Sequence, residues 1–167
     1  MANASAPTGG KNAAPIEPAA RVLRQFRIVF NAIKTHFREV EKKAGVGGAQ
    51  IWALSVIRDS PDIGVNDLAR AMDVHQSTAS NLVKSLVEQA LIVALKKGSD
   101  RRAVQLRLLP AGSRILRRAP APFTGVLPRA LESLDTQTLL RLDQDLGTLI
   151  AALDGDESAG GIPLGQI

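Results

Sequence analysis

The chain has 167 residues, a net charge of +5 and no cysteine. This length suits one domain with tails, and the absence of cysteine excludes disulfides, thiolate metal sites and thiol redox sensing. No apolar stretch approaches membrane-spanning length, and the first 15 residues lack the basic start and apolar centre of a signal peptide. We therefore expect a cytoplasmic protein with no membrane partner.

The positive charge is concentrated in one segment. Residues 91–118 carry eight basic and one acidic side chain, whereas residues 1–90 carry a net +3 and residues 119–167 a net −5. Such a block attracts polyanions, either nucleic acid or anionic lipid, and a solvated basic surface is the alternative. Charge alone leaves these possibilities open.

The two ends of the chain have little to bury. Residues 1–17 are rich in Ala, Pro and Gly, and residues 154–167 look similar, so we expect a disordered tail and a flexible tail. From Pro18, apolar residues at helical spacing predict a first helix of about 25 residues, which the sequence AGVGG ends. The stretch AQIWALSVIRDSP predicts a short, largely buried second helix that ends at Pro61.

Residues 65–86 meet the geometric demands of a helix-turn-helix. Two helical stretches approach each other at the small Ala69, and Asp73 stands in the turn, where a residue tolerant of positive φ is needed. The second helix then buries its apolar residues and turns short polar side chains outward, where they can meet base edges and phosphates. A polar solvent face on a small helical hairpin is the alternative.

The hydrophobic period then changes from that of helices to that of strands. LIVALKK and RAVQLRLL predict two antiparallel strands joined through GSD. A basic hairpin directly after a helix-turn-helix is a winged helix, whose tip reaches toward the minor groove. The fold class is therefore mainly α (α+β), with a winged helix-turn-helix domain over residues 47–110.

The remaining helices suggest a second function for the chain. A helix opens at Pro110 and stops near Arg118, because prolines follow, and Asp135 is a plausible N-cap of the last helix. Residues 18–46 and 111–153 carry apolar stripes that exceed what a small winged domain can cover, which favours a dimerisation region. Packing of these stripes within one chain is the alternative.

The sequences LARAMDVHQSTASNLVKSLVEQALI and GSDRRAVQLRLLPAG resemble the MarR-type family of multiple-antibiotic-resistance regulators. The resemblance covers about residues 20 to 118. It implies that Asp100 orients Arg102, which enters the minor groove, with Arg101 beside it. Three positions depart from the family: Leu109 replaces a threonine, Ala90 a turn glycine, and Asn81 a common arginine.

The resemblance implies a homodimer that binds double-stranded DNA at a pseudo-palindromic operator, as a repressor relieved by a small aromatic effector. The expected DNA contacts come from the second helix of the motif and from the wing: Gln76, Ser77, Thr78, Ser80, Asn81, Lys84, Lys96, Lys97, Arg101 and Arg102. The family's effector cleft makes Phe30, His36, Trp52 and Ser55 candidates for effector binding, with core packing or solvation as the alternative.

No motif for catalysis, metal or cofactor binding is present. The sequence lacks a Gly-x-Ser-x-Gly elbow and a His-Glu-x-x-His pair, and it has only two histidines, so we expect neither an enzyme nor a metal site. Two rival functions remain: a winged-helix module for non-specific DNA or protein contact without effector response, and a small-molecule-binding enzyme. The second would require a titratable pair in a cleft.

Overall fold

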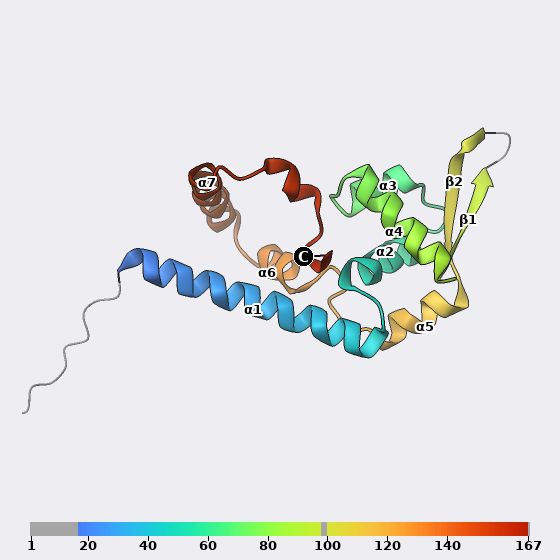
Figure 1. The fold of residues 1–167 in the computed structure, drawn as a ribbon, viewed down its shortest axis with the longest axis horizontal. Coiled ribbons are helices and arrows are strands. Elements are labelled where there is room, and N and C mark those ends of the chain that lie inside the picture. Colours follow the sequence, from blue (N-terminus) through green and yellow to red (C-terminus); the bar gives the residue numbers. More distant parts are fainter. Residues whose placement is uncertain (1–16, 98–99, 167) are drawn as a thin grey trace, which may run out of the picture.

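The computed structural model describes residues 17–97 and 100–166 (Figure 1). The predicted mainly helical fold with one small antiparallel sheet is confirmed. None of the described helices combines the length and hydrophobicity that crossing a bilayer requires. In chain order the elements are α1 (Pro18–Ala44), α2 (Gly48–Asp59), α3 (Val65–Ala71), α4 (Gln76–Glu88), β1 (Ile92–Lys97), β2 (Asp100–Leu108), α5 (Pro110–Arg118), α6 (Val126–Glu132) and α7 (Thr136–Ala152).

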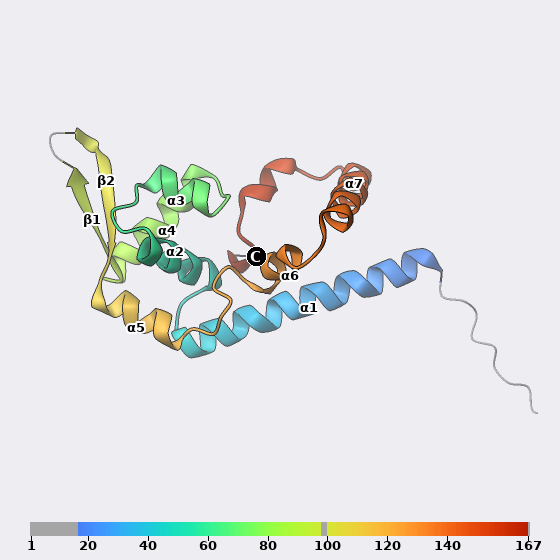
Figure 2. The same cartoon turned by 180° about the vertical axis from the view of Figure 1, so that it is seen from behind.

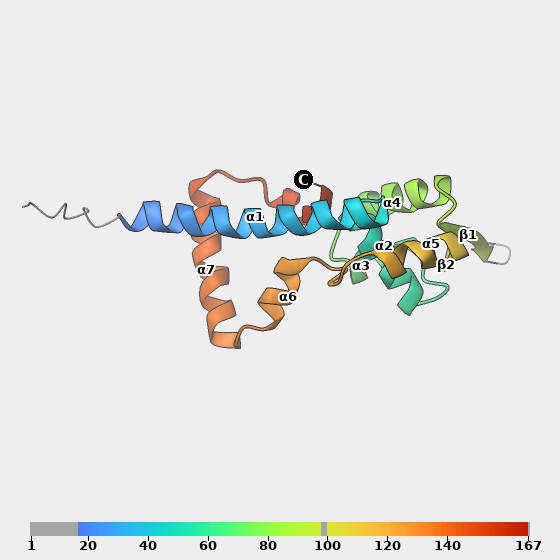
Figure 3. The ribbon, with the colours of Figure 1, turned by 90° about the horizontal axis from the view of Figure 1, so that it is seen from below.

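The long helix α1 begins at a proline and ends at a glycine, the residues that favour these two positions. Pro18 occupies the first turn, and Gly45 adopts a left-handed φ of 76° while its N–H donates to the carbonyl of Glu41. The C-terminal half of α1 packs on the core through Val40 and Ala44, whereas the N-terminal half extends away from the winged domain (Figure 3).

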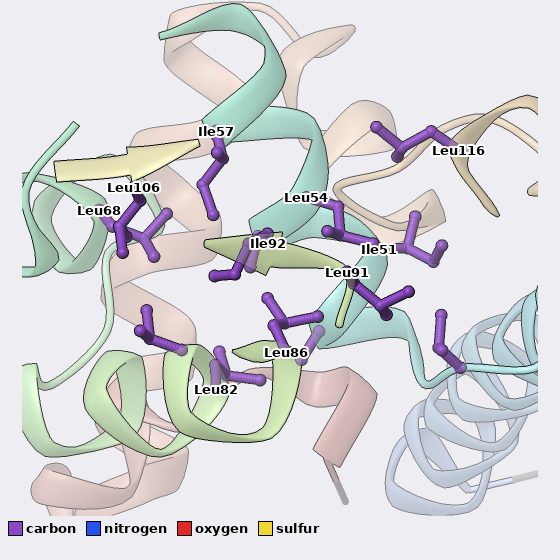
Figure 4. Packing of buried hydrophobic residues seen from close by; sticks show 14 of the residues in the cluster. Ile51, Leu54, Ile57, Leu68, Leu82, Leu86, Leu91, Ile92, Leu106 and Leu116 are labelled. Carbon is purple, nitrogen blue, oxygen red and sulfur yellow. The ribbon is translucent and has the colours of Figure 1, made fainter. Parts of the chain in front are cut away.

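The core lies between α2, the helix-turn-helix, the sheet and α5 (Figure 4). Its largest members are fully buried because each comes from the apolar face of an amphipathic helix or from the inner face of a strand. They include Ile51, Leu54, Ile57, Leu68, Met72, Leu86, Ile92 and Leu106. This single cluster holds the helix-turn-helix and the wing in one unit.

The turn between α3 and α4 has the backbone that the sequence predicts. Asp73 has a φ of 51°, and the N–H of Val74 donates to the carbonyl of Ala69 at 3.0 Å. Ala69 is buried where the two helices approach, as its small side chain allows. The expected helix-turn-helix geometry is therefore present.

Helix α5 begins and ends where the sequence predicts. Its N-cap position, Leu109, makes no side-chain capping bond, and the helix stops at Arg118 before the prolines. Gly112 lies so close to Leu91, the residue before β1, that a Cβ at Gly112 would collide with the carbonyl oxygen of Leu91. This glycine lets the start of α5 lie directly against the start of the sheet.

Helix α7 stands apart from the winged domain (Figure 2). The carboxylate of Asp135 caps it by accepting from the N–H of Thr138 at 2.9 Å, in agreement with the predicted N-cap. None of its 17 residues is buried. Most of its large apolar residues therefore face solvent in the single chain.

The segment after α7 belongs to the stretch 154–167, for which the sequence predicts a flexible tail, and its flexibility stays a prediction. It folds back toward α2 and α3 through two 3-10 turns, Glu157–Gly161 and Leu164–Gln166 (Figure 1). The composition suggested too little to bury, yet Pro163 is buried and Leu164 and Gly165 lie against the N-terminal end of α2. We call residues 156–166 the C-terminal strap.

Candidate nucleic-acid interface

Helix α4 has one buried face and one polar face. Ala79, Leu82, Val83 and Leu86 are buried on the core side. The side chains of Gln76, Ser77, Asn81 and Lys84 are exposed, whereas Thr78 and Ser80 are half-buried. The structure therefore brings the six expected contact residues of α4 onto one helix, with four of them open to solvent.

The polar face of α4 is loosely held by its own contacts. Gln76 Nε2 donates to Ser80 Oγ at 3.1 Å, and the ammonium of Lys84 lies 4.0 Å from the carboxylate of Glu88. Both interactions are exposed and contribute little to stability, so they can be exchanged for contacts with a ligand. The first turn of α4 contains no acidic residue, which leaves its positive dipole end uncompensated from within the helix.

The wing is the antiparallel pair of β1 and β2. Ile92 pairs with Leu108 at its base, and the register shifts between Lys96 and Lys97, so that Lys97 pairs with Asp100. Lys96 is exposed. Gly98 and Ser99 lie outside the described residues, as do the side chains of four expected site residues, Lys97, Asp100, Arg101 and Arg102. The orientation of Arg102 by Asp100 therefore stays a prediction.

The base of the wing is tied to the linker between α2 and α3 by contacts that the sequence does not predict. Ile63 forms a β-bridge with Leu106, whose N–H donates to the carbonyl of Ile63 at 3.0 Å. The guanidinium of Arg107 pairs with the carboxylate of Asp62 through two bonds, one of them 3.0 Å long between Nη2 and Oδ2. The bond to Asp62 raises the pKa of Arg107. A single bridging residue leaves no periodic signal in a sequence.

The expected effector residues separate into two pairs. Trp52 lines a cavity of about 370 Å³ between α1, α2, α6 and the C-terminal strap, and Phe30 lines a neighbouring cavity of about 480 Å³. His36 and Ser55 are buried and line neither of these two cavities. His36 Nε2 donates to the carbonyl of Pro122 at 3.1 Å, and Ser55 Oγ donates to the carbonyl of Trp52 at 2.7 Å.

His75, the N-cap residue of α4, is exposed on one side and lies against the C-terminal strap on the other. Its ring lies against the C-terminal strap, with Nε2 donating to the carbonyl of Ser158 at 2.8 Å. Among the described residues, no group of three or more His, Cys, Asp or Glu side chains is placed to hold a metal ion.

Comparison with known proteins places this interface in a family. A family model described as MarR matches residues 44–103, which contain the helix-turn-helix. A candidate transcriptional regulatory protein for the hcr operon of Thauera aromatica is 32% identical over 123 residues, which cover 73% of this chain and 69% of the relative. The transcriptional repressor MdtR of Bacillus subtilis is 25% identical over 129 residues, which cover 77% and 83%.

Solved structures share the fold. A MepR-like protein complexed with pseudoligands superposes with a TM-score of 0.57 at 22% identity, covering 78% of this chain and 94% of that chain. The DNA complex of Staphylococcus aureus MepR gives a TM-score of 0.52 at 17% identity, covering 82% and 96%. Together with the matched helix-turn-helix and the identity to the Thauera aromatica protein, these findings show that the chain belongs to the MarR family of DNA-binding, winged-helix transcriptional regulators.

Proposed function

We propose that the protein is a homodimeric repressor that binds a pseudo-palindromic operator and releases it in response to a small ligand. The observation that carries this proposal is the exposed polar face of α4, which is held from behind by a buried apolar face. Short hydrogen-bonding side chains such as Ser77 and Asn81 reach base edges without filling the major groove, and Lys84 meets the phosphate backbone. The wing extends beside α4 in the position from which a hairpin reaches the neighbouring groove.

The unburied apolar surface of α7 and of the N-terminal half of α1 supports a dimer. Leu140 of α7 is 65% exposed, Leu153 directly after α7 is 69% exposed, and Phe30 of α1 is 60% exposed. A helix of 17 residues without one buried side chain is not stabilised by packing within its own chain. A second copy would cover these stripes and place two α4 helices about one DNA turn apart.

The cavity beside Trp52 supports the ligand step. Its volume of about 370 Å³ suits a small organic molecule, and its wall is mostly apolar, with Ile33, Phe37 and Met72 among the lining residues. The wall joins α1 and α6 to the turn of the helix-turn-helix, so a molecule bound here would contact both the dimerisation helices and the DNA-binding domain. Such a molecule can shift their arrangement only by binding one arrangement more tightly.

Selection of DNA from a random-sequence library by the full chain tests the operator function. Fluorescence anisotropy then compares the selected duplex with a random duplex of equal length, at salt concentrations from about 50 to 200 mM. We expect the selected duplex to contain an inverted repeat and to bind at least about a thousandfold more tightly than the random one. A ratio near one would instead favour the non-specific DNA or protein-binding module.

The ligand step has its own test. Small aromatic compounds are titrated into the complex of the protein with its selected duplex, and Trp52, the only tryptophan, reports occupancy of the cavity through its fluorescence. We expect compounds that quench Trp52 also to weaken DNA binding. Compounds that quench Trp52 and leave DNA binding unchanged would contradict ligand-responsive repression.

A further inference from the structure

The C-terminal strap makes specific contacts with His75, the residue that precedes α4, the recognition helix of the helix-turn-helix. The backbone N–H of His75 donates to the carbonyl of Gly161 at 3.3 Å, and His75 Nε2 donates to the carbonyl of Ser158 at 2.8 Å. Gly161 lies directly on the imidazole, and a Cβ at this position would collide with the ring. The strap is therefore fitted to His75 by two hydrogen bonds and by close packing.

The far end of the strap is also seated on the protein. Pro163 is buried, and Gly165 approaches so closely that a Cβ there would lie 2.9 Å from the backbone nitrogen of Ala49 in α2. Ile162 and Leu164 line the same cavity as Trp52. The strap thus spans from the first residues of α2 to the N-terminal end of α4.

This position conflicts with DNA binding by α4. In helix-turn-helix proteins the N-terminal residues of the recognition helix contact the bases, and helix N-termini attract phosphate groups. The strap lies against His75, immediately before Gln76, and the carboxylate of Asp156 is close enough to His75 to interact with it electrostatically. Hydrogen bonds from Ser158 lower the pKa of Asp156, so this carboxylate stays charged and repels phosphates.

We propose that the C-terminal strap is autoinhibitory: while it is bound to His75 it occupies the space in front of the N-terminal end of α4, where the DNA backbone would lie, and DNA binding requires its release. The proposal rests on the proposed contact of α4 with DNA. The affinity for DNA is then the intrinsic affinity reduced by the fraction of molecules whose strap is open. Two hydrogen bonds and the packing of Gly161 favour the closed state by about tenfold.

Two neighbouring glycines provide a matched pair of variants in the full chain. Gly161→Ala places a methyl group against the His75 ring, whereas Gly160→Ala places it where no atom lies within 4 Å. Neither glycine has a left-handed φ, so alanine fits both backbones. We expect Gly161→Ala to bind the selected duplex about five- to tenfold more tightly than the wild type, and Gly160→Ala to bind like the wild type.

Two further measurements keep the outcome decisive. Release of the strap opens the cavity wall beside Trp52, so its emission should shift to longer wavelength in Gly161→Ala and not in Gly160→Ala. The variant Asp156→Asn leaves the contact of Gly161 intact, and removal of its charge should raise DNA affinity about twofold, more at low salt than at high salt.

Equal DNA affinities of the two glycine variants, on both the selected and the random duplex, would overturn the proposal, whether or not the Trp52 emission shifts. Failure of the wild type to distinguish the selected from the random duplex would overturn the operator function instead. In that case the glycine pair on the random duplex still decides whether the strap obstructs α4.

Discussion

Two residues with left-handed backbones flank the recognition helix. Asp73 before α4 has a φ of 51°, and Ala90 after it has a φ of 54°. Aspartate tolerates this region because its short polar side chain bonds locally, whereas alanine gains nothing that offsets the steric cost of its Cβ. Ala90 stands where the family resemblance expects a glycine, and the structure shows the physical reason for that preference.

Replacement of Ala90 by glycine should therefore stabilise the protein. Ala90 is exposed, so the substitution removes no packing, and relief of the left-handed strain outweighs the added freedom of the unfolded chain by about 0.5–1 kcal/mol. Urea denaturation measures the free energy of unfolding. The control is Ala130→Gly on the exposed side of α6, which should destabilise by a similar amount. A loss of stability in Ala90→Gly would contradict this account.

Asp135 should make the stability of α7 depend on pH. Bonds from the backbone N–H and hydroxyl of Thr138 lower the pKa of its carboxyl group in the folded state. Because the pKa is lower in the folded state, the ionised carboxylate stabilises the fold at pH values above the pKa of the unfolded state. This stability is lost as the pH falls through the pKa of the folded state. Asp135→Ala should therefore lower stability at neutral pH, and this difference should vanish in acid.

Thermal unfolding of both forms from neutral pH into the acid range measures the effect of Asp135. Asp143→Asn, in the middle of the same helix, is the control for loss of one exposed carboxylate. If wild type and Asp135→Ala still differ in thermal stability at a pH where the Asp135 carboxyl is protonated in both the folded and the unfolded state, the cap does not act through its charge.

Helix boundaries and turns could be predicted from the sequence wherever the residues at those positions determine the backbone conformation by themselves. Helix α1 is bounded by Pro18 and Gly45, and the turn before α4 depends on the backbone tolerance of Asp73; all three are visible in the sequence. The bridge of Ile63 to Leu106 and the seat of Gly161 on His75 depend on contacts between distant segments, which no periodicity encodes. In the candidate site, the polar face of α4 could be predicted because the spacing of polar and apolar residues along one helix determines it.

Arg102 of the wing is proposed to contact DNA. Arg102→Ala should weaken binding to the selected duplex and reduce the slope of affinity against salt by about one counterion. Arg114→Ala in α5 removes an exposed arginine outside the hairpin and should leave the slope unchanged. Anisotropy titrations at several salt concentrations measure both slopes. An unchanged affinity in Arg102→Ala would remove this residue from the DNA contacts.

At the scale of the whole molecule, the exposed apolar stripes predict the assembly. Leu142→Glu in α7 and Phe30→Glu in α1 place a charge within the surface that a second copy would cover, so each should convert the proposed dimer to a monomer of 17.7 kDa. Val87→Glu alters an exposed apolar residue of α4 outside these stripes and should leave the dimer intact. Sedimentation velocity measures the masses, and a monomeric wild type would refute the proposed assembly.

The link of Arg107 and Ile63 between the wing and the linker after α2 has a consequence for the proposed operator. Because the base of the hairpin is fixed to the same body as α4, the bases that α4 and the wing are proposed to contact would lie at a constant distance from each other within each half-site. A ligand that rotates the DNA-binding domains would alter only the separation of the two half-sites. Insertion of base pairs at the centre of the operator would then have the same effect on affinity as the ligand, and each half-site would keep its own sequence requirement.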